Sequence, residues 1–156
     1  MKKWFTLFLF AALTGAVISS CKKDEEEPGP CDELGSVFLK AKIDGDQFCA
    51  NTTLFADYTI LLTVNGMMDN GATLTLELDS LQPGTYEMGE MTNHALYTSS
   101  LAMGYETTDD NPGTLIITSH NEATNRIKGT FSATLRNPLG GDVSLTSGSF
   151  DLVYTE

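Results

Sequence analysis

The chain has 156 residues and a formal net charge of −12, and hydrophobic residues make up 41% of it and charged residues 19%. This composition is that of an ordinary globular domain. The acidic balance argues against nucleic acid as a partner, because phosphates attract basic surfaces, and equally against electrostatic docking to anionic lipid.

The N-terminus has the parts of a secretion signal. A basic start at residues 1–3 is followed by an apolar run over 4–17, and two serines stand directly ahead of Cys21. This order is typical of a cleaved leader, and a cysteine in this place is typical of the lipidated first residue of a bacterial lipoprotein. We therefore expect a signal peptide over 1–20 and a lipid on Cys21 that attaches the protein to the membrane. The alternative is an uncleaved anchor, for which the run is short, because spanning takes about 20 apolar residues.

The segment 21–35 is predicted to be a flexible acidic tether. Charged residues 22–27 and then Pro28-Gly29-Pro30 offer no apolar area to bury, so we expect this segment to be disordered. Lys23-Asp24-Glu25 is similar to the export signal of surface lipoproteins in Bacteroidota. The expected location is the outer membrane with exposure at the cell surface. The alternative is a plain spacer that leaves the domain on the periplasmic face.

Cys31 and Cys49 remain once Cys21 is used by the lipid. An even number of cysteines in an oxidising compartment predicts a disulfide between them. The bond would close a short loop and stabilise the fold by about 3 kcal/mol on the chain-entropy model. The alternative is two free thiols, one of them buried and inert.

The first predicted element of the domain is a hairpin. Apolar residues alternate over 37–43, and Asp44-Gly45 follows. This dipeptide is the strongest short hairpin signal, since both turn positions need positive φ. A two-residue loop then places Ala41 opposite Phe48.

Further strands are predicted over 58–64, 73–78 and 85–88. They are separated by turns at Asn70-Gly71 and Pro83-Gly84. Proline presets φ in such turns and glycine supplies positive φ.

Ser80 lies ahead of the second of these turns. Asp79-Ser80-Leu81 matches the short acceptor pattern for O-glycosylation in Bacteroidota. A turn would leave the hydroxyl within reach of an enzyme, so Ser80 is a candidate modification site.

A strand over 97–105 is predicted next, with Tyr97, Met103 and Tyr105 on one face. These side chains are the candidates for lining a ligand site. On strand positions of matching parity they are otherwise core residues with a polar tip.

The last strands have the clearest pattern. Residues 114–119 are apolar on both faces, which predicts a central strand, and 127–136 alternate strictly. In the final strand the apolar positions change from odd, at Leu145, to even, at Phe150. This change predicts a β-bulge with Gly148 as the extra residue.

No window has helical periodicity. Short strands at steady spacing, joined by turn residues, predict a single all-β domain over 36–156. The expected architecture is an antiparallel β-sandwich or flattened β-barrel of about 8–10 strands.

The C-terminal half carries recognisable motifs. Gly113–Thr118, Ile127–Phe131, a Gly-Gly turn after Asn137, and Val143–Phe150 occur in this order. In these motifs the chain resembles a family of small Bacteroidota lipoproteins with a domain of unknown function. The resemblance implies a secreted, lipid-anchored, all-β domain and supplies no catalytic residues.

No motif for catalysis or metal binding is evident. The spacing of His94 and His120 matches no metal motif, and a G-x-S-x-G nucleophile turn is absent from the sequence. Asp44, Asp46 and residues 109–111 offer oxygens for calcium, but without the ordered spacing of a calcium loop. We therefore expect no cofactor, no metal and no enzymatic activity.

These patterns favour a non-enzymatic binding or accessory module at the cell surface, with a protein or glycan as partner. The alternative is a periplasmic, lipocalin-like carrier of a small apolar ligand inside a barrel. A hydrolase ranks last. A cavity lined by Tyr97, Met103 and Tyr105 would favour the carrier, and a filled core would favour the binding module.

Overall fold

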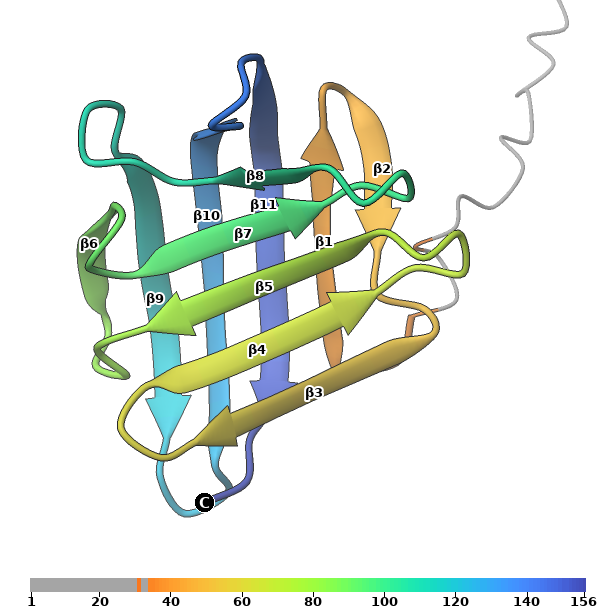
Figure 1. Cartoon of the computed structure of the whole chain (residues 1–156). Helices are drawn as coiled ribbons and strands as arrows, with labels where there is room; N and C mark the ends of the chain where they lie inside the picture. Colours follow the sequence, from red (N-terminus) through yellow and green to blue (C-terminus); the bar gives the residue numbers. More distant parts are fainter. Residues whose placement is uncertain (1–30, 32–33) are drawn as a thin grey trace, which may run out of the picture.

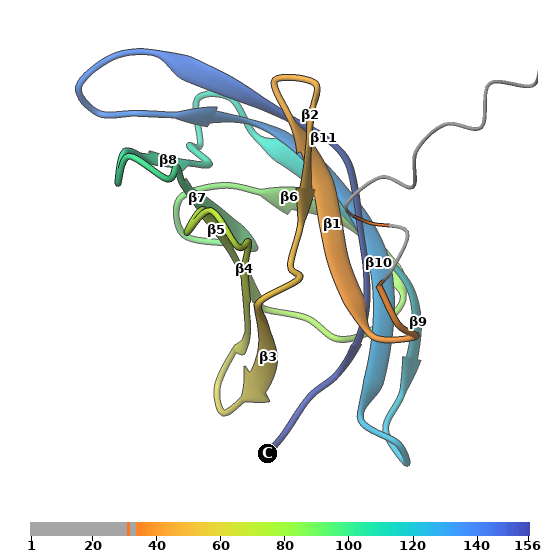
Figure 2. The same cartoon turned by 90° about the vertical axis from the view of Figure 1, so that its right-hand side faces the viewer.

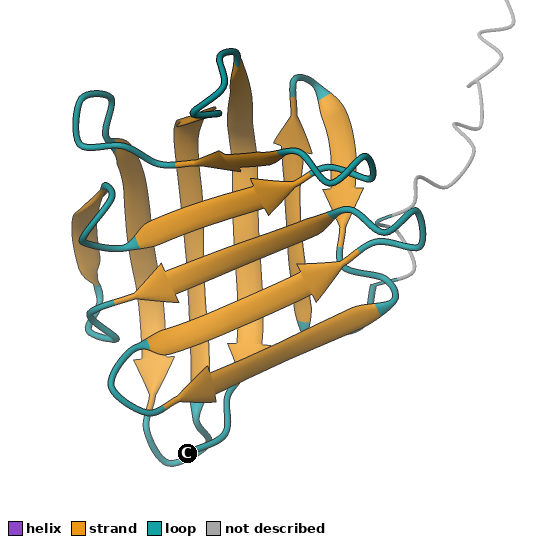
Figure 3. Ribbon diagram, in the orientation of Figure 1, coloured by secondary structure: helices purple, strands orange, loops and turns teal. Residues whose placement is uncertain are grey.

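The computed structural model describes residue 31 and residues 34–156. The predictions for the leader, Cys21 and most of the tether lie outside these residues. All regular structure in the described part is β-strand, which confirms the all-β prediction (Figure 3). Within the same part, the chain forms no helix of the length and hydropathy that membrane crossing requires.

Eleven antiparallel strands are joined by hydrogen bonds into one sheet in the described part. The strands are β1 (Phe38–Ile43), β2 (Asp46–Cys49), β3 (Thr53–Tyr58), β4 (Leu62–Met67), β5 (Thr73–Leu78), β6 (Gly84–Met88), β7 (His94–Thr98), β8 (Gly104–Glu106), β9 (Gly113–Asn121), β10 (Arg126–Arg136) and β11 (Asp142–Val153).

The sheet is curled into an open half-barrel. Its order is β2-β1-β11-β10-β8-β7-β5-β4-β3, with β9 paired to β10 and β6 to β9. In Figure 1, β1, β2, β9, β10 and β11 form the rear layer, and β3, β4, β5, β7 and β8 run across them in front. The two layers are seen from the side in Figure 2.

The strand β10 connects the two layers. It pairs with β9 from Arg126 to Ser132, and then with β8 through Arg136 and Glu106. The sheet therefore turns from one layer into the other at the end of β10. On the opposite side of the half-barrel, Asp57 of β3 forms a parallel bridge with Thr155.

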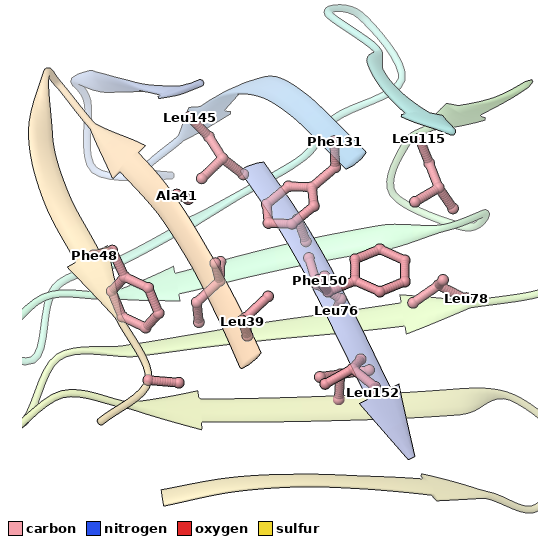
Figure 4. Close-up of a cluster of buried hydrophobic side chains, with 14 of the residues drawn as sticks. Leu39, Ala41, Phe48, Leu76, Leu78, Leu115, Phe131, Leu145, Phe150 and Leu152 are labelled. Carbon is pink, nitrogen blue, oxygen red and sulfur yellow. The ribbon is translucent and has the colours of Figure 1, made fainter. Parts of the chain in front are cut away.

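Hydrophobic side chains from both layers meet between them. Leu39 and Phe150 of the rear layer and Leu76 of the front layer are at most 2% exposed. Figure 4 shows these side chains in one cluster, together with residues from β2, β9 and β10. The space between the layers is thus a packed hydrophobic core, which agrees with the alternation predicted for these strands.

The first hairpin has the predicted turn and register. Asp44 and Gly45 form its two-residue loop with φ of 51° and 93°. Ala41 pairs with Phe48, as expected.

Cys31 and Cys49 are joined by a disulfide, with their Cα atoms 5.4 Å apart. The bond spans 18 residues of sequence. It should stabilise the fold by about 3 kcal/mol by restricting the unfolded chain. It also holds residue 31 against β2.

The predicted bulge is present in β11, but its extra residue is Ser147. From the register on either side, Ser132 of β10 faces Thr146 and Ser147, and Ala41 of β1 faces Ser147 and Gly148. Ser147 is the residue common to both irregularities and has a φ of 51°. Because of the bulge, the apolar residues at odd positions before it, such as Leu145, and at even positions after it, such as Phe150, point into the same core.

Gly148 has a different role, which it shares with Gly129. Gly129 pairs with Phe150, and Phe131 pairs with Gly148, so each phenyl ring lies across from a glycine. A Cβ at Gly129 would lie 2.5 Å from the ring of Phe150, and one at Gly148 would lie 2.5 Å from the ring of Phe131. The two rings stack with centroids 6.2 Å apart. Aromatic side chains cover glycines in sheets in this way, and the pairing pins the register.

Two predicted strands are wrong in their bounds. Residues 58–64 do not form one strand, because β3 ends at Tyr58 and the chain turns through Ile60, which is 86% exposed. Residues 97–105 are split as well: β7 ends at Thr98 and β8 begins at Gly104. The split raises the strand number above the expected range. Both turns lack the Gly or Pro that marks a turn in sequence, so alternation alone suggested continuous strands.

The strand β9 is central in pairing but not buried on both faces. It lies between β6 and β10. Leu115 and Ile117 point into the core, while Ile116 is 39% exposed on the outer face. The central position predicted from the apolar residues is therefore confirmed, although the outer face of the strand is not covered.

We expect Gly129→Ala to destabilise the fold by about 1–3 kcal/mol, because overpacking in a filled core forces its neighbours apart. The new Cβ would also lie 2.5 Å from the backbone oxygen of Ile116, which cannot rotate away. Gly35→Ala is the matched control, since a Cβ there has no neighbour within 4 Å. Urea unfolding measures both variants. Equal midpoints for the two variants would contradict the packing described.

Candidate functional site

A groove of about 300 Å³ opens at the end of the half-barrel where the first hairpin approaches β7 and β8. Its walls come from both layers of the curled sheet. The polar and aromatic side chains that matter for recognition are Asp44, Asp46, Gln47, Asn70, Tyr97 and Tyr105.

Two tyrosines form one wall of this groove. Tyr97 of β7 pairs directly with Tyr105 of β8, and their ring centroids are 6.2 Å apart with the planes tilted by 31°. Phe48 of β2 packs edge-on against Tyr97, with centroids 6.3 Å apart. Both tyrosines are half-buried, so each ring has a packed side and an accessible side.

The hairpin tip supplies the carboxylates. The Asp44 N–H donates to the Ser144 carbonyl at 2.9 Å, and the Ser144 N–H donates to Asp44 Oδ1 at 2.7 Å. These two bonds hold the tip of the hairpin against β11. Asp46, the first residue of β2, follows the loop directly and lines the groove with Asp44.

Burial raises the pKa of Tyr97 above its usual value, and Tyr105, Asp44 and Asp46 raise it further in that order. The nearby carboxylates disfavour the phenolate because it carries the same charge. At neutral pH the Tyr97 hydroxyl is therefore a neutral group that can donate one hydrogen bond and accept others.

This arrangement suits a ligand with both hydroxyl groups and apolar faces. Carboxylate and amide side chains can hydrogen-bond to hydroxyls, and tyrosine rings offer flat apolar area beside them. The two carboxylates come from one hairpin turn rather than from facing walls. Glycoside hydrolysis needs carboxyl groups on both sides of the scissile bond, which this turn does not provide.

The structure brings two of the three candidate ligand-lining residues together. Tyr97 and Tyr105 share the groove, but on neighbouring strands rather than on one. Met103 does not line it. Met103 is 46% exposed in the turn after β7, where its N–H donates to Ser99 Oγ and Ala102 adopts a φ of 60°.

The two histidines are not brought into one site. His94 Nε2 lies 3.5 Å from Glu106 Oε2, while His120 Nε2 is 2.8 Å from the hydroxyl of Tyr154. Across the residues that the structure describes, no three His, Cys, Asp or Glu side chains are grouped so that they could hold a metal ion.

Ser80 lies half-buried in the connection between β5 and β6. Its hydroxyl donates to the Tyr86 hydroxyl at 3.0 Å, and Tyr86 donates in turn to the Gln82 carbonyl at 2.8 Å. A glycan on Ser80 would remove the first of these bonds. Its glycosylation stays a prediction.

Sequence reasoning did not connect the acidic hairpin tip with the tyrosines. Asp44 and Asp46 were considered as oxygens for calcium, and Tyr97 and Tyr105 as residues that could line a ligand site, but as two separate sets. Their meeting depends on the curl of the sheet, for which no local pattern is a signal.

The Tyr97 phenol should ionise above the ordinary value of 10.0 in the folded protein. Because the folded pKa is raised, its contribution to stability is complete below about pH 10 and is lost as the pH rises through the folded pKa. Absorbance titration at alkaline pH, compared between the parent and Tyr97→Phe, isolates this phenol. Asp46→Asn should lower its pKa toward the ordinary value. An unchanged titration in Asp46→Asn would show that this carboxylate does not face Tyr97.

Comparison with known proteins gives one result. No curated protein and no solved structure matches the chain. Residues 36–153 match a family described as Domain of unknown function (DUF6252), which covers nearly all of the half-barrel. The chain therefore belongs to the DUF6252 family.

Proposed function

We propose that the protein is a lipid-anchored lipoprotein of the outer membrane that is exposed at the cell surface and binds glycan without enzymatic activity. The leader, Cys21 and the acidic segment behind it support the anchoring and the location. The likeness to small Bacteroidota lipoproteins supports the same cell envelope.

The groove at the open end of the half-barrel is the observation that supports the binding function. Tyr97 and Tyr105 offer ring faces, while Asp44, Asp46 and Gln47 surround them with hydrogen-bonding groups. Sugars present both C–H faces and hydroxyls, so this mixture favours them over a purely apolar ligand.

The carrier alternative has less support. An apolar ligand would need an apolar cavity, whereas hydrophobic side chains of both layers pack together between them (Figure 4). The groove that does contain the two tyrosines is bordered by carboxylates. Burying an apolar ligand against these groups would cost their hydration. A hydrolase still ranks last.

Cys21→Ala should release the protein from membranes or leave it as an unprocessed precursor, because the lipid is the proposed attachment. Cys31→Ser is the matched control and should stay with the membrane, since Cys31 belongs to the disulfide. Membrane fractionation and mass spectrometry of the N-terminus measure both variants, and protease added to whole cells distinguishes the surface from the periplasmic face. A processed Cys21→Ala protein that still sediments with membranes would refute the lipid anchor.

Oligosaccharide binding should be visible through tyrosine fluorescence, because the only tryptophan is Trp4 in the leader. A panel of gluco-, xylo-, manno- and N-acetylglucosamine oligosaccharides is titrated into the mature protein, with calorimetry as a second measurement. At least one should bind saturably.

Tyr105→Ala should weaken that binding about tenfold or more, which corresponds to about 1.4 kcal/mol or more. Phe55→Ala is the control, because Phe55 is an aromatic residue 53% exposed on β3 that does not line the groove. If the panel shows no binding, or if Tyr105→Ala binds as tightly as the parent, the groove is not a glycan site.

A further inference from the structure

The basic residues of the half-barrel are confined to two strands. The sequence has no lysine or arginine between Lys42 and Arg126. In the described part, Lys40 and Lys42 lie on β1, and Arg126, Lys128 and Arg136 lie on β10. These strands flank β11 on either side, so all the cations of the described part are in the rear layer of Figure 1.

The cations share the outer face of this layer. Leu39 and Ala41 are buried in the core, so Lys40 and Lys42 point outward from the alternate positions of β1. The same alternation holds on β10, where Ile127 is buried and Arg126 and Lys128 flank it. We call the outer face of β1, β11 and β10 the basic face.

Most of the basic face is already neutralised. Arg126 Nε lies 2.6 Å and Lys128 Nζ 2.7 Å from carboxylate oxygens of Asp151, and Arg136 Nε lies 3.3 Å from Asp142. The Arg126 hydrogen bond, with help from Lys128, holds the pKa of Asp151 below its usual value. Ion pairs among the described residues do not include Lys40 and Lys42.

Lys40 and Lys42 border a second groove, of about 310 Å³. It shares only Gln47 with the groove lined by Tyr97 and Tyr105, which we call the tyrosine groove. Its other lining residues are Cys31, Ala41, Gln47 and Ser147, so no carboxylate of the described part lines it. The groove is suited to an anion. The disulfide to Cys49 places Cys31 in the wall of this groove. The chain that leads into Cys31 must therefore reach the groove at its C-terminal end.

We propose that the acidic segment Asp24–Glu27 of this chain docks on the basic face at Lys40 and Lys42. Glu27 is four residues before Cys31 and Asp24 seven. At about 3.3 Å per residue the chain allows them to reach about 13 and 23 Å from Cys31. Lys40 and Lys42, about 7 Å apart on one strand, are within that reach.

Charge and tethering both favour this occupant. The segment carries four consecutive carboxylates, and the groove carries two ammonium groups. Each exposed pair is weak and sensitive to salt. The contact is intramolecular, however, and the disulfide shortens the connection between the segment and the lysines, which raises their effective concentration.

The docking has a consequence for orientation that rests on the proposed lipid at Cys21. Docking would turn the basic face toward the membrane. The front layer of Figure 1, which contains no lysine or arginine, would then face outward.

Carbodiimide crosslinking of the purified full chain tests the contact directly. The reagent joins a lysine amine to a carboxylate with loss of water, and only when the two groups touch. The expected product joins a peptide containing residues 24–27 to Lys40 or Lys42 within one molecule. Its yield should fall severalfold at about 1 M salt, where screening is strong. The Lys128–Asp151 pair, whose carboxylate is 9% exposed, is the internal standard.

Two variants separate the contact from simple proximity. Cys31→Ser should lower the yield of the crosslink severalfold, because it releases the chain from the groove wall while the Lys128–Asp151 product remains. Lys40→Gln with Lys42→Gln should speed cleavage after Glu25–Glu27 by a glutamate-specific protease. Arg136→Gln, which removes a cation already paired with Asp142, should leave that cleavage rate unchanged.

Residues 24–27 linked only to Lys22 or Lys23, or only between two molecules, would overturn the proposal. So would cleavage of the double lysine variant at the parent's rate. These outcomes do not depend on the lipid, because fractionation of Cys21→Ala tests the anchor separately.

Discussion

The pairing of β10 with β11 is the constraint on which the rest of the half-barrel depends. β11 also pairs with β1, and β10 also pairs with β9 and β8, so these two strands connect every part of the sheet. Reciprocal pairing of Phe131 with Gly148 and of Phe150 with Gly129 sets their register. A slip of either strand by one residue would move the core side chains of that strand to the outer face. The bulge at Ser147 keeps both halves of β11 directed into the same core.

The curl that follows from this pairing creates the tyrosine groove. The end of β10 carries the sheet over to β8 and β7, and these strands bring Tyr105 and Tyr97 toward the first hairpin. Buried Thr107, which follows β8, holds β8 against β7 and the end of β6. Its hydroxyl accepts a hydrogen bond from the Ala95 N–H and donates one to the Gly89 carbonyl. Tyr97 is thus carried by β7, which is paired with β5 on one side and β8 on the other, and such a held strand suits a binding site that needs little ordering when a ligand enters.

Positive charge is distributed unevenly over the domain. The lysines and arginines of the described domain lie on β1 and β10, where Arg126 and Lys128 pair with Asp151, and the remainder of the described domain carries carboxylates without lysine or arginine. Such a division gives the domain a basic side and an acidic side. It therefore biases how the domain sits against any charged segment or surface, and the effect weakens as salt rises.

The sequence alone was sufficient for the all-β class, the first hairpin with its register, the Cys31–Cys49 bond, and the existence of a bulge in the last strand. These features follow from simple rules. Apolar residues alternate with a period of two, turn residues with positive φ mark the hairpin, and an even number of cysteines remains once Cys21 is assigned to the lipid. The turn after Thr98 was missed because Ala102 takes positive φ without glycine. Cys31 lies beside Lys40 as a consequence of these simple rules, because the disulfide joins it to Cys49, which pairs with Lys40 in the first hairpin. The grouping of Tyr97 with Asp44, in contrast, was decided only by the tertiary structure. It depends on how far the sheet curls and which strands it brings together, and that is set by the long-range pairing of β10 rather than by any neighbouring residues.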